Sequence, residues 1–196
     1  MSRPAQYAKG IAKRAEIIDT ALQLIGSAGY DKMTIPELAN AVGLSQPGLI
    51  HYFGTKDQLF VEILRERDAR TERAAAGVFV PSRVALENQS VPGLIELYTH
   101  VMVESSAPGH VGHEFTRARY ERARREIAEA LRQAQAEGRV DPSLDPAKTA
   151  AVLFGAWDGL QIQWMHDHSI DISAHLDYLW RTLIGITDDA AVSFAG

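Results

Sequence analysis

Apolar residues recur at intervals of three and four along most of the chain, which is the period of an α-helix that buries one face. The first such stretch covers about residues 9–28, and its apolar stripe contains Ile11, Ile18, Leu22 and Ile25. No segment of the sequence alternates apolar and polar residues as a half-buried β-strand does. The pattern therefore predicts an all-α protein of about nine helices.

Very tight connections join the helices predicted within residues 34–59. Thr34 and Glu37 form a T-x-x-E capping box at the start of one helix, and Gly43 after it allows a sharp turn. Ser45 caps the next helix, and a T-x-x-Q box opens the one that follows. This order is that of a helix-turn-helix, in which the helix after the turn can enter the major groove of DNA.

The helix that begins after Ser45 has an apolar back and a polar front. Leu49 and Phe53 lie four residues apart and point inward together. Gln can bond adenine through two hydrogen bonds and His can reach a base or a phosphate, while hydroxyl groups, Lys and helix amino termini suit phosphates. We therefore predict DNA contacts from Thr34, Ser45, Gln46, Pro47, Gly48, His51, Tyr52, Thr55 and Lys56.

Helical patterns continue beyond a connector at residues 74–90, which is rich in Ala, Gly, Pro and Ser. Further helices are predicted at about residues 91–106, 114–137, 145–166 and 172–184. They form a larger C-terminal helical bundle. It follows a head of three predicted helices, which lies within residues 1–56.

The formal net charge of −5 hides an asymmetry that matters for a DNA-binding protein. Residues 1–56 carry six Lys or Arg against four Asp or Glu, and residues 57–196 carry fourteen against twenty-one. The first fourteen residues contain the cations Arg3, Lys9, Lys13 and Arg14 and no acid. Phosphates respond to nearby charge, because remote charges are screened beyond roughly 10 Å. The amino-terminal end therefore permits DNA binding.

Composition excludes several other kinds of chemistry. The chain has no Cys, which rules out disulfides, thiolate metal ligands and cysteine nucleophiles. It has no apolar run long enough for a membrane-spanning helix, and its basic amino terminus lacks the apolar core of a signal peptide. We therefore expect a cytoplasmic protein without a membrane partner.

The stretch from Gly29 to Leu64 resembles the TetR family of transcriptional regulators. The motifs that carry the resemblance are Gly29-Tyr30, Thr34-Ile35…Leu38-Ala39, Gly43-Leu44-Ser45, His51-Tyr52-Phe53 and Thr55-Lys56-Asp57…Leu59. Gly48 and Ile50 depart from the commonest pattern, because Thr, Ser or Ala is frequent at the first position and Tyr at the second. In this respect the chain is similar to members with P-G-L-L/I-H sequences.

The resemblance implies a functional organisation. Residues 1–56 would form the DNA-binding domain, and residues 57–196 the ligand-binding and dimerisation domain. Such proteins are usually homodimers that grip a double-stranded, near-palindromic operator, most often as repressors. An unidentified small-molecule effector would shift the two heads and release the DNA. No catalytic residue and no cofactor is implied.

Two further sets of residues follow from helical spacing combined with this resemblance. The predicted effector pocket is lined by Tyr98, His100, Met102, Phe115, Tyr120, Trp157 and Gln161, with plain core packing as the alternative. The helices at about 145–166 and 172–184 form an αα-hairpin that would pair with its twin. The predicted dimer interface comprises Ala151, Gly155, Gly159, Leu176, Leu179 and Leu183.

Competing interpretations rest on the C-terminal half. His110-x-x-His113-Glu114, with His100 nearby in the sequence, has ligand types that bind metals, but this spacing is common by chance and we expect no metal. An all-α enzyme would use His, Glu and Asp in a C-terminal cavity, although no recognisable catalytic arrangement is present. A helical interaction module that has lost DNA binding is the other alternative.

Overall fold

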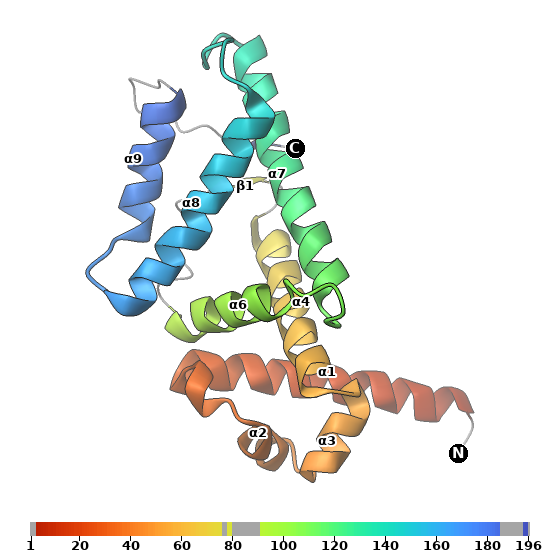
Figure 1. Ribbon diagram of the computed structural model, residues 1–196. Coiled ribbons are helices and arrows are strands. Elements are labelled where there is room, and N and C mark those ends of the chain that lie inside the picture. The colour runs from red at the N-terminus through yellow and green to blue at the C-terminus, as the bar shows by residue number, and fades with distance from the viewer. Residues whose placement is uncertain (1–2, 76–77, 80–90, 185–193, 196) are drawn as a thin grey trace. The chain divides into compact units, whose positions relative to one another are not determined.

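Helices form where the apolar period predicts them. The computed structural model describes residues 3–75, 78–79, 91–184 and 194–195. Within those ranges the chain contains eight α-helices and one short 3-10 helix (Figure 1). The prediction of an all-α fold is confirmed.

The helix bounds agree closely with the predicted ranges, except that the first helix begins earlier than residue 9. The α-helices, labelled as in Figure 1, are α1 (Arg3–Ala28), α2 (Ile35–Ala41), α3 (Gln46–Phe53), α4 (Lys56–Ala75), α6 (Pro92–Glu104), α7 (His113–Ala136), α8 (Pro146–His166) and α9 (Ile172–Ile184). The 3-10 helix η1 (Tyr30–Lys32) follows α1. Within the described ranges, no helix combines the length and the apolar content needed to cross a membrane.

Two very short strands were not predicted from the sequence. Strands β1 (Val78–Phe79) and β2 (Phe194–Ala195) pair antiparallel, with Val78 opposite Ala195. Each strand has two residues, which is too short for an alternating pattern to be recognised.

The chain divides into two compact units. Unit 1 comprises residues 1–74 and 91–113, and unit 2 comprises residues 75–90 and 114–196. Unit 1 therefore contains α4 and α6 in addition to the three predicted head helices, so this structural division differs from the predicted boundary after residue 56. The functional assignment of residues 1–56 and 57–196 stays a prediction.

The buried face of α1 differs slightly from the predicted stripe. Ile17, Ala21 and Ile25 lie four residues apart and are almost completely buried, whereas Ile11 is 54% exposed. Ile18 and Leu22 lie at the edge of this face and are half-buried. The amino-terminal part of α1 is thus largely exposed, and Ile11 does not belong to the core of unit 1.

Two cations of α1 bind the carboxyl ends of the helices that it supports. Arg14 Nη1 donates to the carbonyl of Tyr52 at 2.6 Å, and its guanidinium carbon lies 4.7 Å from the centre of the Phe53 ring. Lys13 Nζ donates to the carbonyl of Val42 at 2.8 Å. Carbonyls at a helix carboxyl end lack partners within the helix and carry partial negative charge, which these cations compensate. Half of the cations in the basic amino terminus are therefore used inside unit 1.

Close backbone contact joins α6 to the end of α1. Gly93 is buried, and a Cβ atom at this position would lie 2.8 Å from Tyr30 N and 2.9 Å from Ile25 O. Beside this contact, the Tyr30 ring lies 5.8 Å from that of Phe60 and 5.5 Å from that of His100, centre to centre. Burial, reinforced by the nearby Glu104 carboxylate, raises the pKa of Tyr30 to about 12, so its hydroxyl stays neutral.

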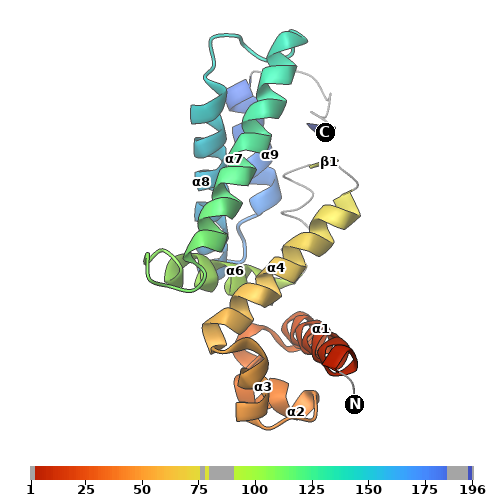
Figure 2. The same cartoon turned by 90° about the vertical axis from the view of Figure 1, so that its right-hand side faces the viewer.

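Unit 2 has its own apolar core. Buried residues of α7 and α8 and of the loop between them form one cluster, against which α9 packs with Leu179, Trp180 and Leu183 (Figure 2). The cluster consists of Ile127, Ala128, Leu131, Ala134, Val140, Ala150 and Leu153. The α8–α9 hairpin predicted from the sequence is confirmed. All three tryptophans of the chain lie in these two helices.

Replacing Gly93 by Ala is expected to destabilise the protein by about 1–3 kcal/mol, because the new methyl group would meet backbone atoms that cannot turn away. Gly10→Ala is the matched control, since Gly10 is also helical and its added Cβ would meet nothing within 4 Å. Its helix should gain roughly 0.5–1 kcal/mol. Urea denaturation followed by far-UV circular dichroism measures both changes. Equal stabilities for the two variants would contradict the close contact.

Arg14→Met tests the bond to the end of α3. Methionine keeps an apolar group over Phe53 but loses the charge-assisted hydrogen bond, which is worth about 1.5–3 kcal/mol. Amide hydrogen exchange in α2 and α3 should accelerate accordingly. Lys9→Met removes the same charge from an exposed position on α1 and should leave the exchange unchanged. Identical exchange in both variants would show that the hydrogen bond from Arg14 to the Tyr52 carbonyl does not stabilise α3.

Candidate nucleic-acid interface

The position of α3 is determined by the residues on its inner face. Leu49 is completely buried and Phe53 is 5% exposed, whereas Gln46, Pro47 and His51 are exposed. The preceding turn depends on Gly43, whose φ of 67° lies in the left-handed region that other residues rarely adopt. The helix and its exposed front are as predicted, and the contacts with DNA remain predictions.

An open hollow lies between the amino-terminal ends of α2 and α3. It is lined by Ile35, Gln46, Pro47 and Ile50. Gln46 and Ile50 are four residues apart, so they share the side of α3 that faces this hollow. In the sequence, Ile35 stands out only as part of a family motif and Ile50 only as a departure from the family pattern. The signal that could have indicated the hollow is an apolar residue one turn beyond Gln46.

Gly48 serves the cap of α3. Its backbone N–H donates to Ser45 Oγ at 3.1 Å, which confirms the predicted cap. A Cβ atom at this position would lie 3.0 Å from the same oxygen, tighter than an ordinary contact. Gly48 therefore fits the cap closely, and it offers no side chain to DNA.

The capping box of α2 is present but reduces the suitability of Thr34 for phosphate. The hydroxyl of Thr34 donates to the Glu37 carboxylate at 2.8 Å, and the Glu37 N–H donates back to the hydroxyl oxygen at 3.3 Å. The carboxylate thus occupies the amino-terminal end of α2, where it would repel an anion. Asp57 lies in the first turn of α4, whereas the first turn of α3 has no acid. Of these three helices, α3 best keeps its partial positive charge for a ligand.

The remaining candidates surround the carboxyl end of α3. Thr55 Oγ1 accepts from the Gln58 N–H at 3.0 Å, but the Gln58 side-chain amide donates to Glu62, so only this half of the predicted T-x-x-Q box is observed. Lys56 is exposed, with Nζ 5.1 Å from the centre of the Phe60 ring. Tyr52 is half-buried beside the exposed His51. His51, Thr55 and Lys56 are thus the exposed candidates in this group, and Thr55 also caps α4.

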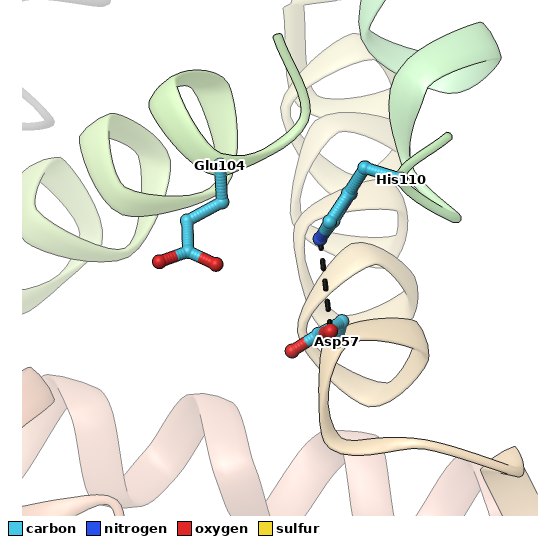
Figure 3. Close-up of side chains that lie close together, drawn as sticks. All are labelled: Asp57, Glu104 and His110. Carbon is cyan, nitrogen blue, oxygen red and sulfur yellow. Dashed lines mark ion pairs between the residues drawn. The ribbon is translucent and has the colours of Figure 1, made fainter. Parts of the chain in front are cut away.

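A second group of polar side chains was not predicted. Asp57 at the start of α4, Glu104 at the end of α6 and His110 in the following loop place ligand atoms within 4.8 Å of one another (Figure 3). His110 Nε2 faces the Asp57 carboxylate at 3.8 Å (dashed in Figure 3). Asp57 is far from the other two residues in the sequence, and no local spacing indicates that it meets them.

The hydrogen bonding of His110 disfavours a metal at this group. The Gly112 N–H donates to His110 Nδ1 at 3.0 Å, so a neutral ring carries its proton on Nε2. A metal ligand needs the lone pair of Nε2, but in this tautomer Nε2 carries a hydrogen instead. The atom is buried and has no hydrogen-bond partner within the described residues. The group is therefore better described as an electrostatic contact between the loop and α4.

The other histidines considered as metal ligands have separate contacts. The ring of His100 lies against Tyr30 and Phe60. His113 Nδ1 lies 2.9 Å from the carbonyl oxygen of Ser105. These contacts fit packing and loop structure.

The predicted pocket residues divide between the two units. In unit 1, Tyr98 and Met102 are buried. In unit 2, the Tyr120 hydroxyl donates to the Asp158 carboxylate at 2.8 Å, and the Tyr120 ring lies edge-on to Phe154. Gln161 is 2% exposed, and its Nε2 has no hydrogen-bond partner within the described residues. Phe115 and Trp157 are half-buried in the same unit.

The predicted dimer residues of α8 and those of α9 differ in their exposure. Ala151 and Gly155 are exposed on α8, beside Val152 and Ile162, which are 56% and 44% exposed. Gly159 follows on the same face and is half-buried. By contrast, Leu176 is buried, while Leu179 and Leu183 pack against the core of unit 2. The leucines of α9 were assigned to the interface because their spacing is regular, but in the single chain they serve its own core.

Sequence comparison supports the assignment of the head. Residues 17–63 match the profile of the bacterial regulatory proteins of the tetR family. The HTH-type transcriptional repressor Rv1474c of Mycobacterium tuberculosis is 42% identical over 65 residues, which cover 33% of each chain. The match therefore spans about a third of the length of this relative.

Solved structures extend the similarity of fold to most of the chain. The regulatory protein TetR from Rhodobacter sphaeroides has a TM-score of 0.64 at 19% identity, and covers 86% of this chain and 95% of its own. A transcriptional regulator from Saccharomonospora viridis in complex with choline has a TM-score of 0.63 at 24% identity, with the same coverage. Residues 17–63 therefore match the tetR family of bacterial regulatory proteins, and most of the chain shares the fold of these solved structures.

Proposed function

We propose that the protein is a sequence-specific DNA-binding transcriptional regulator whose α3 enters the major groove. The observation that carries the proposal is the division of α3 into a back with buried Leu49 and Phe53 and a front with exposed Gln46 and His51. A helix fixed in this way presents base-reading groups without losing its own packing. Lys56, exposed at the start of α4, would hold a phosphate beside it.

Repression is the mode of regulation that we propose. The M. tuberculosis relative is named a transcriptional repressor, and its similarity lies in the part that would contact DNA. A repressor needs only to occupy an operator, so the head alone accounts for that activity. We assign no catalytic step to the chain, and we place its action in the cytoplasm, where the DNA is.

We further propose that a small-molecule effector binds within unit 2 and releases the DNA. The structural neighbour from S. viridis was solved with choline, which shows that a protein of this fold holds a small molecule. In this chain, the buried Gln161 offers an amide donor that has no partner among the described residues, so the effector would present a hydrogen-bond acceptor. Tyr120, Phe154 and Trp157 would supply the apolar and aromatic wall.

A homodimer is the third part of the proposal. The exposed face of α8 combines small residues with uncovered apolar side chains, namely Ala151, Val152, Gly155 and Ile162. Small residues let a second helix approach closely, and a two-fold axis brings the same face of each chain together. Two heads would then read two half-sites of one operator.

Lys56→Ala and Gln46→Ala should weaken DNA binding in different ways. Without Lys56, affinity should fall about equally for all duplexes, and the salt dependence should decrease by about one phosphate per head. Without Gln46, the discrimination between bases should fall by about 1–3 kcal/mol at one position of each half-site, and the other positions should be unaffected. Fluorescence anisotropy, with duplexes selected by the full chain from a random pool, measures both effects.

Lys148→Ala is the control for these variants, because Lys148 is 86% exposed but lies in unit 2. Its affinity for DNA should equal that of the unchanged protein. Selection of no duplex by the unchanged protein would refute the proposed function, and full affinity in both head variants would refute the placement of α3.

Gly155→Glu should convert the dimer into monomers. A Cβ atom at this position meets nothing within 4 Å in the single chain, so the fold should tolerate the change, whereas a charged side chain would separate two closely packed helices. Sedimentation velocity should show a dimer of the 21.5 kDa chain at micromolar concentration and a monomer for the variant. Gly109→Glu, equally open but in unit 1, should remain dimeric. A monomeric unchanged protein would disprove this interface.

A further inference from the structure

The hollow between α2 and α3 is apolar in a place where polar groups would be expected. Ile35, Pro47 and Ile50 line it together with Gln46. Around it, the outward-facing candidates for DNA contact are polar, for example Ser45, which lies next to Gln46. None of the three apolar side chains can form a hydrogen bond with a phosphate or with the polar edge of a base. If α3 enters the major groove, this hollow must face something apolar or remain hydrated.

The major groove exposes one prominent apolar group, which is the C5-methyl of thymine. In an A·T pair this methyl lies on the same groove edge as adenine N6 and N7, the two atoms that a Gln side chain can bond together. Gln46 and Ile50 are four residues apart on one side of α3, so an amide and an apolar surface are offered side by side. The amide of Gln46 thus matches adenine N6 and N7, and the neighbouring apolar surface matches the thymine methyl of the same base pair.

We propose that this hollow is a thymine-methyl subsite, and that it selects an A·T pair in each half-site of the operator together with Gln46. Ile50 and Pro47 form its wall on α3, and Ile35 closes it from α2. The inference rests on the proposed DNA-binding function and extends it to a particular base pair. It also gives Ile50, which departs from the family pattern, a role as a specificity-determining residue.

The test removes the methyl group without changing the base pairing. Each thymine of the tightest duplex selected by the full chain is replaced in turn by deoxyuridine, which lacks only the C5-methyl. One position in each half-site should lose about fourfold in affinity, the value expected for the transfer of one methyl-sized group from water. Replacement in both half-sites should reduce affinity about fifteenfold.

Variants then assign the effect to the hollow. Ile50→Ala should bind the thymine and deoxyuridine duplexes with affinities within about twofold of each other. Pro47→Ala, on the exposed rim, should reduce the discrimination and is the second variant in case Ile50→Ala does not fold. Val103→Ala shortens an exposed apolar side chain of α6, which does not line the hollow, and should keep the full discrimination.

The possible results separate the subsite from DNA binding itself. A protein that binds its selected duplex but tolerates deoxyuridine at every position overturns the subsite and leaves the proposed function intact. Discrimination that persists in both Ile50→Ala and Pro47→Ala also overturns it. A protein that selects no duplex refutes the DNA-binding function and the subsite with it.

Discussion

Leu49 and Phe53 are buried in unit 1, and their burial determines which residues of α3 face outward. A helix of eight residues is too short to be stable alone, so its orientation comes from packing. Rotation of α3 by one residue would expose an apolar side chain and bury a polar one, and both changes are unfavourable. Arg14 adds a polar contact at the end of the same helix, through the Tyr52 carbonyl. The packing of the buried face of α3 therefore fixes the orientation of its exposed face.

Charges at the helix ends distinguish α3 from its neighbours. Glu37 and Asp57 place carboxylates in the first turns of α2 and α4, which compensates the partial positive charge there. The first turn of α3 has no such acid. At the opposite ends, Lys13 and Arg14 bind carbonyls of α2 and α3. The partial charges at these ends of α2, α3 and α4 are thus compensated. The amino-terminal end of α3 keeps its partial positive charge, which would attract a polyanion.

Features set by neighbouring residues could be predicted from the sequence, and features that need the fold could not. The Ser45 cap was predicted because donor and acceptor lie three residues apart. The cluster of Asp57 with Glu104 and His110 was missed, because folding alone brings these residues together. Spacing shows that Leu176 belongs to an apolar face, but it cannot tell whether that face meets the same chain or another. The hollow beside Gln46 was missed for a related reason, since an isoleucine in a helix is first assigned to the core.

The location of the tryptophans has a practical consequence for optical experiments. Trp157 and Trp164 lie in α8 and Trp180 in α9, so the tryptophan emission of the protein originates in unit 2. Excitation at the red edge of the absorption band, where tyrosine does not absorb, would report events around these two helices without any label. Events confined to α2 and α3 would be silent in that signal. A change in emission on adding an operator would therefore be direct spectroscopic evidence that occupation of the head is felt in the other unit.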